Sequence, residues 1–540
     1  LVFDGLTIVI SPLIALMKDQ VQNLNANGIP AAYLNSSLTS SQETTIKKRL
    51  VEKEYTLLYI APERLFSRGF LDFITQLKIS LFAIDEAHCI STWGHHFRPD
   101  YKQLSILKTR FPEIPIMALT ATADKAVRKD IADLLLLNEP KFYINSFDRP
   151  NLSLGVLPGQ KKWEQLLKTV EKYPDESGII YCGSRAATET LAQKLCKIGK
   201  KAVCYHAGLE PDYRSKMQDQ FIQGQVDIVC ATIAFGMGID KSDIRYVIHY
   251  NMPGNLESLY QEIGRAGRDG DPAETFLFYS YRDVQTHLGF INDVENKAHR
   301  SILHAKLKRI QEYAEAQVCR RKILLSYFSE TPGSDCGNCD VCANPPQYFD
   351  GSIEAQKAIS AIARSHEKLG ISTLTEVLKG QYSQIVKDNN WQSLKTFGLG
   401  RELTSFAWQL YLQQMIQQGV LEIDYEDHYN LKLTPISQRV LKGEPVRLVN
   451  FETIKLRQAE QKKKSKATTK SKINHLEDLP IDENLFNALK ELRKEIAQEI
   501  RKPAYVVFSD TSLKDMAKKI RDIANNGRTN IRQNWNTGNN

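Results

Sequence analysis

The sequence has no apolar run near the roughly 18 consecutive residues that a membrane-spanning helix needs, so we expect a protein without membrane spans. It also has no G-x-x-x-x-G-K-[ST] motif, the P-loop whose backbone N–H groups and lysine cradle the phosphates of a nucleotide. The one Gly-Lys pair, at 199–200, is followed by Lys201 and has no glycine at the required upstream position. Residues 1–540 therefore contain no recognisable phosphate cradle of this type.

Cysteine is scarce and no signal-peptide pattern is recognisable, which together predict a reducing, intracellular compartment. The net charge of +8 is a modest excess that permits a polyanionic partner without requiring one. The composition, 42% hydrophobic over 540 residues, fits a globular protein of about three to five domains. Five of the nine cysteines are scattered among apolar neighbours, where we expect core positions: Cys89, Cys182, Cys196, Cys204 and Cys230.

One stretch, residues 81–101, concentrates the candidate chemistry of the chain. The apolar run Leu81–Ile84 predicts a buried parallel strand, and Asp85 and Glu86 follow at the carboxyl end, where open α/β sheets bind ligands. An aspartate there can hold the Mg²⁺ of a nucleoside triphosphate, and the next glutamate can orient or deprotonate the attacking water. The pair alone is weak evidence, because solvated Asp-Glu pairs are common.

An aromatic and basic loop follows this pair of carboxylates. Aromatic side chains interleaved with cations suit stacking on unpaired bases, while arginine or histidine meets phosphate. Core packing is the alternative for Trp93 and Phe97, but the polar run with its glycine and proline favours an exposed loop. The candidate nucleic-acid contacts in this loop are Trp93, His95, Phe97 and Arg98.

The run Asp-Glu-Ala-His at 85–88, continued by Cys-Ile-Ser-Thr-Trp-Gly-His-His-Phe-Arg-Pro-Asp-Tyr, resembles the DEAH-type Walker B motif and aromatic-rich loop of RecQ-family DNA helicases of superfamily 2. The resemblance extends over nearly the whole chain. It implies an α/β fold with two RecA-like parallel-sheet lobes, followed by a zinc-binding helical module, a winged helix and a partial small helical domain. It also implies ATP and Mg²⁺ as cofactors, with His88 joining Asp85 and Glu86 as a catalytic residue.

The resemblance also bears on both ends of the sequence. In the resembled family the P-loop lies just upstream of the point at which this chain begins, so we expect a truncated N-terminus. Near the other end the resemblance stops at about Lys519, and the asparagine-rich residues 521–540 diverge from the family pattern. We expect a second truncation or a change of reading frame there.

We assign residues 1–146 to the first lobe, because strands alternate there with helical segments as in a doubly wound parallel sheet. Ser11 follows an apolar strand and is placed to cap a helix that begins with proline; the segment resembles motif Ia and implies a contact with the DNA backbone. Arg64 lies in a segment that resembles motif Ib, another DNA contact. Thr120 and Thr122 lie at another strand end, where pairs of threonines often only cap a helix. The segment resembles motif III, however, which implies that the two residues couple the triphosphate site to DNA and that Thr120 contacts the cofactor.

We assign residues 147–290 to the second lobe, where the alternation of strands and helices starts again. The run at 261–268, Gln-Glu-Ile-Gly-Arg-Ala-Gly-Arg, is near-identical to helicase motif VI. Because Arg265 and Arg268 are three positions apart, on a helix both would face the same way, toward the charge that develops on a transferring phosphoryl group. A surface ion-pair patch is the alternative. The resemblance further implies a catalytic role for Gln261, cofactor contacts for Gly238, Asp240, Arg265 and Arg268, and DNA contacts for Arg185 and Thr232.

Residues 291–347 hold the four remaining cysteines. Cys336, Cys339 and Cys342 form a tight C-x-x-C-x-x-C run, and Cys319 precedes it by a helical segment. Four thiolates at this spacing suit a tetrahedral Zn²⁺ with no open position, which predicts a structural role. An iron–sulfur cluster is the chemical rival. The resemblance to the family's zinc subdomain favours Zn²⁺.

The rest of the chain predicts smaller units. Residues 348–447 read as helices followed by a strand pair at 419–425 and 429–433, the pattern of a winged helix, and their position implies binding of duplex or forked DNA. Residues 448–478 predict a basic linker, either simply solvated or a weak DNA tether. Residues 479–540 resemble part of the helicase-and-RNase-D C-terminal domain, in which Tyr505 would stack on single-stranded DNA.

Taken together, the resemblance implies an ATP-dependent 3′–5′ DNA helicase that acts on single-stranded and forked duplex DNA in recombination and repair. It also implies a cytoplasmic, nucleoid-associated bacterial protein with single-strand-binding protein as a partner. Two rivals remain open. An RNA helicase shares the lobes but would not explain the aromatic loop and the four cysteines together. A DNA-binding protein without ATPase activity is the other, because the P-loop motif is absent from these residues.

Overall fold

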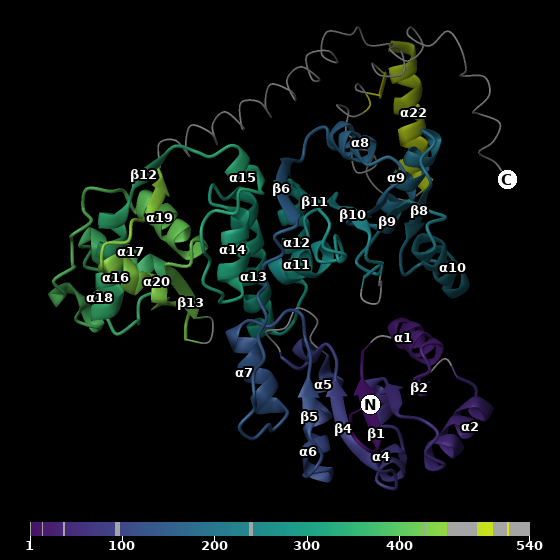
Figure 1. Cartoon of the computed structure of the whole chain (residues 1–540). Coiled ribbons are helices and arrows are strands. Elements are labelled where there is room, and N and C mark those ends of the chain that lie inside the picture. Colours follow the sequence, from purple (N-terminus) through teal and green to yellow (C-terminus); the bar gives the residue numbers. More distant parts are fainter. Residues whose placement is uncertain are drawn as a thin grey trace. The chain divides into compact units, whose positions relative to one another are not determined.

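The computed structural model describes residues 2–12, 14–35, 38–91, 98–236, 241–424, 427–450 and 483–499, with 513, 516 and 517 (Figure 1). The chain forms two compact units, Leu1–Val449 and Asn450–Asn540. Of the helices in the described part of the chain, none combines the length and the apolar character that a membrane crossing requires.

The first sheet has five parallel strands, and its inner strands are buried on both faces. In spatial order they are β2 (Ala31–Leu34), β3 (Leu57–Ile60), β1 (Leu6–Ile10), β4 (Ile79–Ile84) and β5 (Ile116–Ala118). Ile8 and Ile10 pack into one apolar cluster and Val9 into another, because successive side chains of a strand point to opposite faces. The helices are α1 (Ile14–Ala26), α2 (Ser40–Val51), α3 (Pro62–Leu65), α4 (Phe70–Ile74), α5 (Pro99–Lys102), α6 (Ile106–Arg110) and α7 (Lys125–Leu134).

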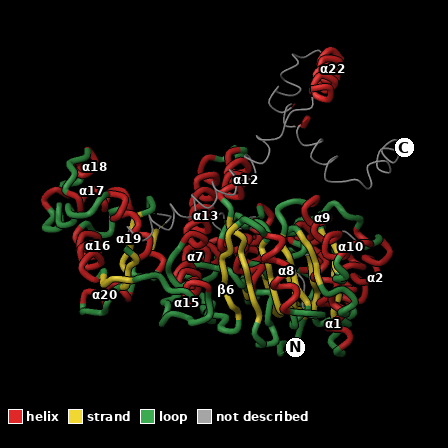
Figure 2. The backbone as a smooth tube through the Cα atoms, turned by 90° about the horizontal axis from the view of Figure 1, so that it is seen from above, coloured by secondary structure: helices red, strands yellow, loops and turns green. Residues whose placement is uncertain are grey.

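The second sheet has six parallel strands and the same double burial. Their order is β6 (Leu152–Pro158), β11 (Ala273–Tyr279), β10 (Ile244–His249), β7 (Ser177–Tyr181), β9 (Ile228–Ala231) and β8 (Ala202–Tyr205). Ile179 and Ile180 belong to different core clusters, and Figure 2 shows helices around the strands. The connecting helices are α8 (Lys162–Lys172), α9 (Arg185–Lys197), α10 (Pro211–Ile222) and α11 (Leu256–Ile263). The prediction of two doubly wound parallel sheets is confirmed.

Four helices follow the second sheet and form what we call the cysteine module: α12 (Tyr281–Asn292), α13 (Lys297–Glu315), α14 (Arg320–Tyr327) and α15 (Asp340–Ala343). The module has no separate core. Its buried Ile310, Cys319 and Val341 belong to the cluster that also contains Leu152 and Leu154 of β6. A parallel bridge joins Leu154 to Cys339. The module and the second sheet therefore fold around one shared apolar core.

The next segment is a compact helical domain with a β-hairpin. Its elements are β12 (Tyr348–Asp350), α16 (Ser352–Arg364), α17 (Ile371–Lys379), α18 (Gln384–Asp388), α19 (Ser405–Gln417), β13 (Leu421–Asp424), β14 (Asn430–Leu433), α20 (Pro435–Leu441) and β15 (Arg447–Val449). The antiparallel pairs are β13 with β14 and β12 with β15. The predicted strand pair is confirmed, within shorter bounds. Trp408 is fully buried, and its Nε1 donates to the Gly400 carbonyl at 2.8 Å.

We expect Trp408→Ala to lower the free energy of unfolding of this domain by about 3–5 kcal/mol, because it empties a large volume and orphans a carbonyl acceptor. Denaturant unfolding followed by circular dichroism measures the change. Phe406→Ala is the matched control, since that ring on the same helix is 52% exposed and should cost less than about 1.5 kcal/mol. Equal losses for the two variants would contradict the burial seen for Trp408.

The second unit is described mainly by one helix, α22 (Glu483–Glu499). This helix lies near the start of residues 479–540, which the sequence analysis treats as one unit. Most of the predicted basic linker, Tyr505 and the divergent residues 521–540 lie outside the described residues.

Candidate functional site

Asp85 lies just beyond the carboxyl end of β4, held by its backbone and by its own carboxylate. Its N–H donates to the Ile10 carbonyl of β1 at 2.8 Å, which continues the sheet by one bond. Its Oδ2 accepts from Ser11 Oγ at 3.2 Å and its Oδ1 from the Glu86 N–H at 2.9 Å. Burial, and next the adjacent Glu86 carboxylate, raise the pKa of Asp85. The sheet thus presents a preorganised, partly desolvated carboxylate pair at the edge where ligands bind.

The chain turns sharply at Glu86, and His88 links the Glu86 side chain to the end of the neighbouring strand β5. Its φ of 48° lies in the left-handed region, which a glutamate rarely adopts and which the surrounding contacts must hold. His88 is fully buried, and its Nδ1 lies 3.2 Å from Glu86 Oε2 and 2.9 Å from Thr120 Oγ1. His88 therefore bridges the carboxylate turn after β4 and the threonine turn after β5.

A cavity of about 1500 Å³ is lined on one side by residues of the first sheet and its connections, and on the other by residues of α10, α11 and the turn after α11, which pack around the second sheet. Asp85, Glu86 and Thr120 contribute to its wall, as do Gln261 and the arginine-bearing turn. Gln261 Nε2 donates to Thr122 Oγ1 at 3.4 Å and makes a direct polar contact between α11 and the turn after β5. The cavity also follows the open edge of β5, where Met117 and Leu119 are half exposed, and the segment with the exposed side chains of Phe142, Tyr143 and Ile144.

The two arginines of this cavity lie on a turn and not on a helix. Helix α11 ends at Ile263, so the prediction that Arg265 and Arg268 share a helix face is wrong. Gly267 has a φ of 55°, and a Cβ there would come within 2.8 Å of the Asp271 carbonyl oxygen, so glycine is required. Arg265 is 5% exposed and Arg268 is exposed, yet both line the cavity. The turn therefore presents one buried and one exposed guanidinium to the same space.

The buried guanidinium lies among polar groups that sequence reasoning did not identify. Tyr181 donates to the Phe235 carbonyl at 2.9 Å, and burial raises the pKa of its phenol to about 12 although Arg265 opposes this. The ring of Tyr181 stacks on His249, whose Nε2 lies 2.6 Å from Glu262 Oε2. His249, which follows the apolar run Tyr246–Ile248 at the end of β10, was the one signal in the sequence for this cluster.

Ser11 is placed differently from the prediction. Helix α1 begins at Ile14, so Ser11 is not the residue next to its first turn. The hydroxyl is fully buried and donates to Asp85 instead. The strong acceptor next to the end of β1 competes for the hydroxyl that the pattern assigned to a helix cap. Ser11 thus belongs to the carboxylate site.

The other predicted DNA contacts that the structure describes are spread over both sheets. Arg64 pairs with Glu43 and lies over the Phe70 ring, and Arg98 Nη1 donates to the Pro12 carbonyl at 3.2 Å. Arg185 is exposed at the first turn of α9, and the Thr232 hydroxyl accepts from the Ala234 N–H at 3.4 Å. None of these four is among the residues lining the cavity. Six predicted residues lie outside the described residues: Trp93, His95, Phe97, Gly238, Asp240 and Tyr505.

The four clustered cysteines come together as the spacing predicted. Their Sγ atoms all lie within 4.8 Å of one another, and the Cys336 and Cys342 sulfurs are 3.9 Å apart. Zinc–sulfur bonds of about 2.3 Å in a tetrahedron place sulfurs about 3.8 Å apart, so the donor set fits Zn²⁺. The N–H groups of Cys336 and Cys342 donate to Cys319 Sγ and Cys339 Sγ, both at 3.4 Å, which favours thiolates.

The scattered cysteines are not all in the core. Cys89, Cys182 and Cys230 are buried as predicted, whereas Cys204 is intermediate and Cys196 is exposed. Cys196 lies on the solvent side of α9, where its Sγ lies 3.1 Å from the Ala202 carbonyl. Its apolar sequence neighbours suggested burial, but on a helix only one stripe of residues faces the core.

Comparison with known proteins gives matches over most of the chain. The matching family models are the DEAD/DEAH box helicase (residues 3–130), the helicase conserved C-terminal domain (161–270), RecQ zinc-binding (281–343), the RQC domain (345–465) and the HRDC domain (482–522). The protein named ATP-dependent DNA helicase RecQ in Pasteurella multocida (strain Pm70) is 44% identical over 96% of this chain and 80% of its own length. Proteins of the same name in Haemophilus influenzae and Bacillus subtilis (strain 168) are 42% and 36% identical, each over 96% of this chain and over 82% and 84% of their own lengths.

Proposed function

The chain belongs to the RecQ family of ATP-dependent DNA helicases, and we propose that it couples ATP hydrolysis, in the cavity between its two parallel sheets, to 3′–5′ movement on single-stranded DNA. The observation that carries this proposal is the composition of the cavity wall. Asp85 and Glu86 follow strand β4 of the first sheet, and Arg265 and Arg268 lie on the turn after α11, next to the second sheet. A bound nucleotide that contacts both the carboxylates and the arginines would change the distance between the two sheets when it is hydrolysed.

The charged residues of the cavity wall have proposed roles that suit their chemistry. Asp85 would hold the Mg²⁺ of the bound ATP, which supplies charge neutralisation on the phosphates. Glu86 would orient the attacking water, and His88, which lies close to both Glu86 and Thr120, would fix that carboxylate. Arg265 and Arg268 are the groups that would stabilise the charge developing on the transferred phosphoryl group.

The contact between Gln261 and Thr122 offers a route from the nucleotide to the DNA. It joins the helix before the arginine turn to the turn after β5. At 3.4 Å the hydrogen bond is long, so a small shift of either sheet would break it. Hydrolysis would change the position of the arginine turn, and this contact would pass the change to the first sheet.

We propose that DNA is bound by the residues that the sequence analysis singled out: Ser11, Arg64, Trp93, His95, Phe97, Arg98, Arg185, Thr232 and Tyr505. The burial of Ser11 against Asp85 favours only an indirect part for its side chain. Forked duplex DNA as the substrate, single-strand-binding protein as the partner, and a cytoplasmic, nucleoid-associated location belong to the same proposal. So do the division of the chain at 146/147, 290/291 and 347/348 and the cofactor contacts of Gly238 and Asp240.

The choice between DNA and RNA tests the substrate part of the proposal. We expect this chain, loaded with zinc, to bind a single-stranded DNA oligonucleotide more tightly than an RNA of the same sequence. Fluorescence anisotropy at one fixed salt concentration measures both dissociation constants, because phosphate contacts make affinity depend strongly on salt. Equal affinities, or tighter binding of RNA, would favour the rival RNA helicase.

A further inference from the structure

Residues 146–152 lead from the first sheet into the second, and we call them the linker; they are distinct from the basic linker predicted at 448–478. The linker packs against the turn that carries Arg265 and Arg268, which we call the arginine turn. Arg149 of this segment donates three hydrogen bonds to that turn. Its Nη1 lies 3.3 Å from the Gly264 carbonyl, and its Nη2 lies 3.0 Å from the Ala266 carbonyl and 2.9 Å from the Gly267 carbonyl. The Gly264 and Gly267 carbonyls belong to the peptide units just before Arg265 and Arg268, and the Ala266 carbonyl lies between the two arginines.

The turn needs such a donor because it begins where a helix ends. The last carbonyls of a helix have no partner within it, and a turn shaped by two glycines offers few of its own. One half-buried guanidinium meets three of these carbonyls with a rigid, planar fork of N–H groups. Asn151 adds two bonds, from its Nδ2 to the Gly267 carbonyl at 2.8 Å and to the Asp271 carbonyl at 2.9 Å. The linker thus fixes the direction in which the arginine turn leaves α11.

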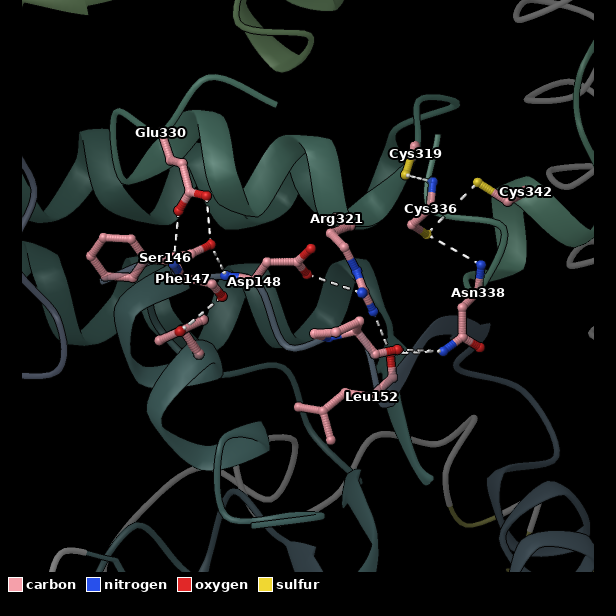
Figure 3. Close-up of polar contacts among 12 residues, drawn as sticks. Ser146, Phe147, Asp148, Leu152, Cys319, Arg321, Glu330, Cys336, Asn338 and Cys342 are labelled. Atoms are coloured by element: carbon pink, nitrogen blue, oxygen red, sulfur yellow. Dashed lines mark hydrogen bonds and ion pairs between the residues drawn. The ribbon is translucent and has the colours of Figure 1, made fainter. Parts of the chain in front are cut away.

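The linker is in turn held from its other side by the cysteine module (Figure 3). Glu330 accepts from Ser146 Oγ at 2.6 Å and from the Phe147 N–H at 2.7 Å. Arg321, which is 8% exposed, donates to Asp148 Oδ1 at 3.0 Å and to the Leu152 carbonyl at 2.5 Å. Arg149 therefore lies between residues that the module holds on both sides.

One of these contacts starts within the metal-binding loop itself. Asn338 lies between Cys336 and Cys339, and its Nδ2 donates to the Pro150 and Leu152 carbonyls, each at 3.2 Å. Its own carbonyl accepts from the Leu154 N–H at 3.3 Å. Figure 3 shows Asn338 and Arg321 converging on Leu152 from the module. The folded state of the cysteine loop is thus coupled to the position of the linker.

Aromatic rings also join the linker, the cysteine module and α11. The ring of Phe147 lies parallel to Phe328 of the module, with centroids 4.4 Å apart and an interplanar angle of 6°. Tyr260 of α11 packs edge-on against Phe147 at 5.7 Å and donates its hydroxyl to the Phe147 carbonyl at 3.0 Å. Linker, module and the helix that leads into the arginine turn therefore share one packed contact.

We propose that Arg149 is a positioning residue for the turn that carries Arg265 and Arg268, and that the cysteine module braces the linker so that Arg149 stays in place. The use of the two arginines in phosphoryl transfer rests on the proposed function; the brace itself is a property of the fold. The cysteine module then has a task beyond its own stability and beyond any contact with DNA. It sets the geometry of the arginine side of the cavity.

Hydrogen–deuterium exchange of the zinc-loaded 540-residue chain tests the brace without nucleotide. Arg149→Ala should speed exchange of the amides at 264–270 by about tenfold or more, because several of them are bonded within the turn. Strand β10 should keep its protection. Arg149→Lys should give an intermediate effect, since a lysine retains the charge but not the fork. Asn145→Ala, at the exposed position just before the linker, is the matched control and should not change exchange at 264–270.

The module side of the brace has its own variant. Glu330→Gln should speed exchange of both the linker and the 264–270 amides while the zinc content stays unchanged, and this variant decides the matter if Arg149→Ala fails to fold. Unchanged exchange at 264–270 in Arg149→Lys and Glu330→Gln would overturn the proposal. So would a uniform rise over the whole second sheet, which would mean a loss of stability only. Because no ATP is present, a failure of the brace and a failure of the proposed function give different results.

Discussion

Removal of the metal from the four-cysteine cluster is expected to unfold the cysteine module. The reason is that Cys319 and Cys339 belong to the apolar core that the module shares with the second sheet. Without metal, four thiols would lie within 4.8 Å of one another with no ion to hold them. Structural zinc supplies apparent binding free energies of about 10–16 kcal/mol, more than the stability of most domains. Zinc analysis together with denaturant unfolding, before and after chelation, measures the loss.

Cys339→Ser should reproduce the effect of chelation, because it removes a buried ligand that also lies next to Leu154. Cys196→Ser is the matched control. That cysteine is exposed on α9, and we expect its replacement to leave the zinc content intact and the stability within about 0.5 kcal/mol. Full zinc retention in Cys339→Ser, or a visible absorption band of an iron–sulfur cluster in the purified protein, would contradict the assignment.

Asp85→Asn is expected to abolish DNA-stimulated ATP hydrolysis and, at neutral pH, to stabilise the fold. The amide cannot hold a divalent cation as a carboxylate does, so we expect a loss of at least about 100-fold in rate. The stability effect has the opposite sign. Burial and the neighbouring Glu86 raise the pKa of Asp85 above its value of 3.8 in the unfolded chain, so ionisation of this carboxyl costs more in the folded state.

A carboxyl group whose pKa is raised in the folded state favours folding while it is protonated. This contribution to the free energy of unfolding is fully present below the unfolded pKa and is lost as the pH rises through the folded pKa. The gain from Asp85→Asn should therefore be largest at pH 7 and shrink as the pH falls toward 3.8. Urea unfolding at both ends of the range in which the protein stays folded measures this. Asp133→Asn, at an exposed position on α7, should show no such trend. A destabilised Asp85→Asn protein at pH 7 would contradict the account.

The sequence predicted those parts of the fold that depend on local pattern. Continuous apolar runs such as Leu81–Ile84 can be satisfied only by burial on both faces, and this led to the doubly wound sheets. The spacing of the cysteines predicted their cluster for a similar reason, since a tight C-x-x-C-x-x-C run cannot place its sulfurs far apart. Asp85 and Glu86 could be located because they directly follow such a strand.

The remaining parts depend on contacts between distant segments. Ser11 was assigned to a helix cap because its partner, Asp85, lies 74 positions away. Arg265 and Arg268 were placed on a helix because propensity does not show where the glycines end it. Arg149 gave no signal, since its three acceptors are backbone carbonyls more than 110 positions further along the chain. Tertiary contacts of this kind override local preference.

The most direct test of the central claim is ATP hydrolysis with and without single-stranded DNA. It should be measured for this chain and for a fusion in which a strand, a P-loop and a helix precede Leu1, since residues 1–540 contain no such motif. The account predicts that DNA stimulates hydrolysis by the fusion and that Asp85→Asn or Arg268→Ala abolishes the stimulation. A fusion that binds zinc and DNA, yet hydrolyses ATP at the same rate with and without DNA or is unaffected by either substitution, would contradict it.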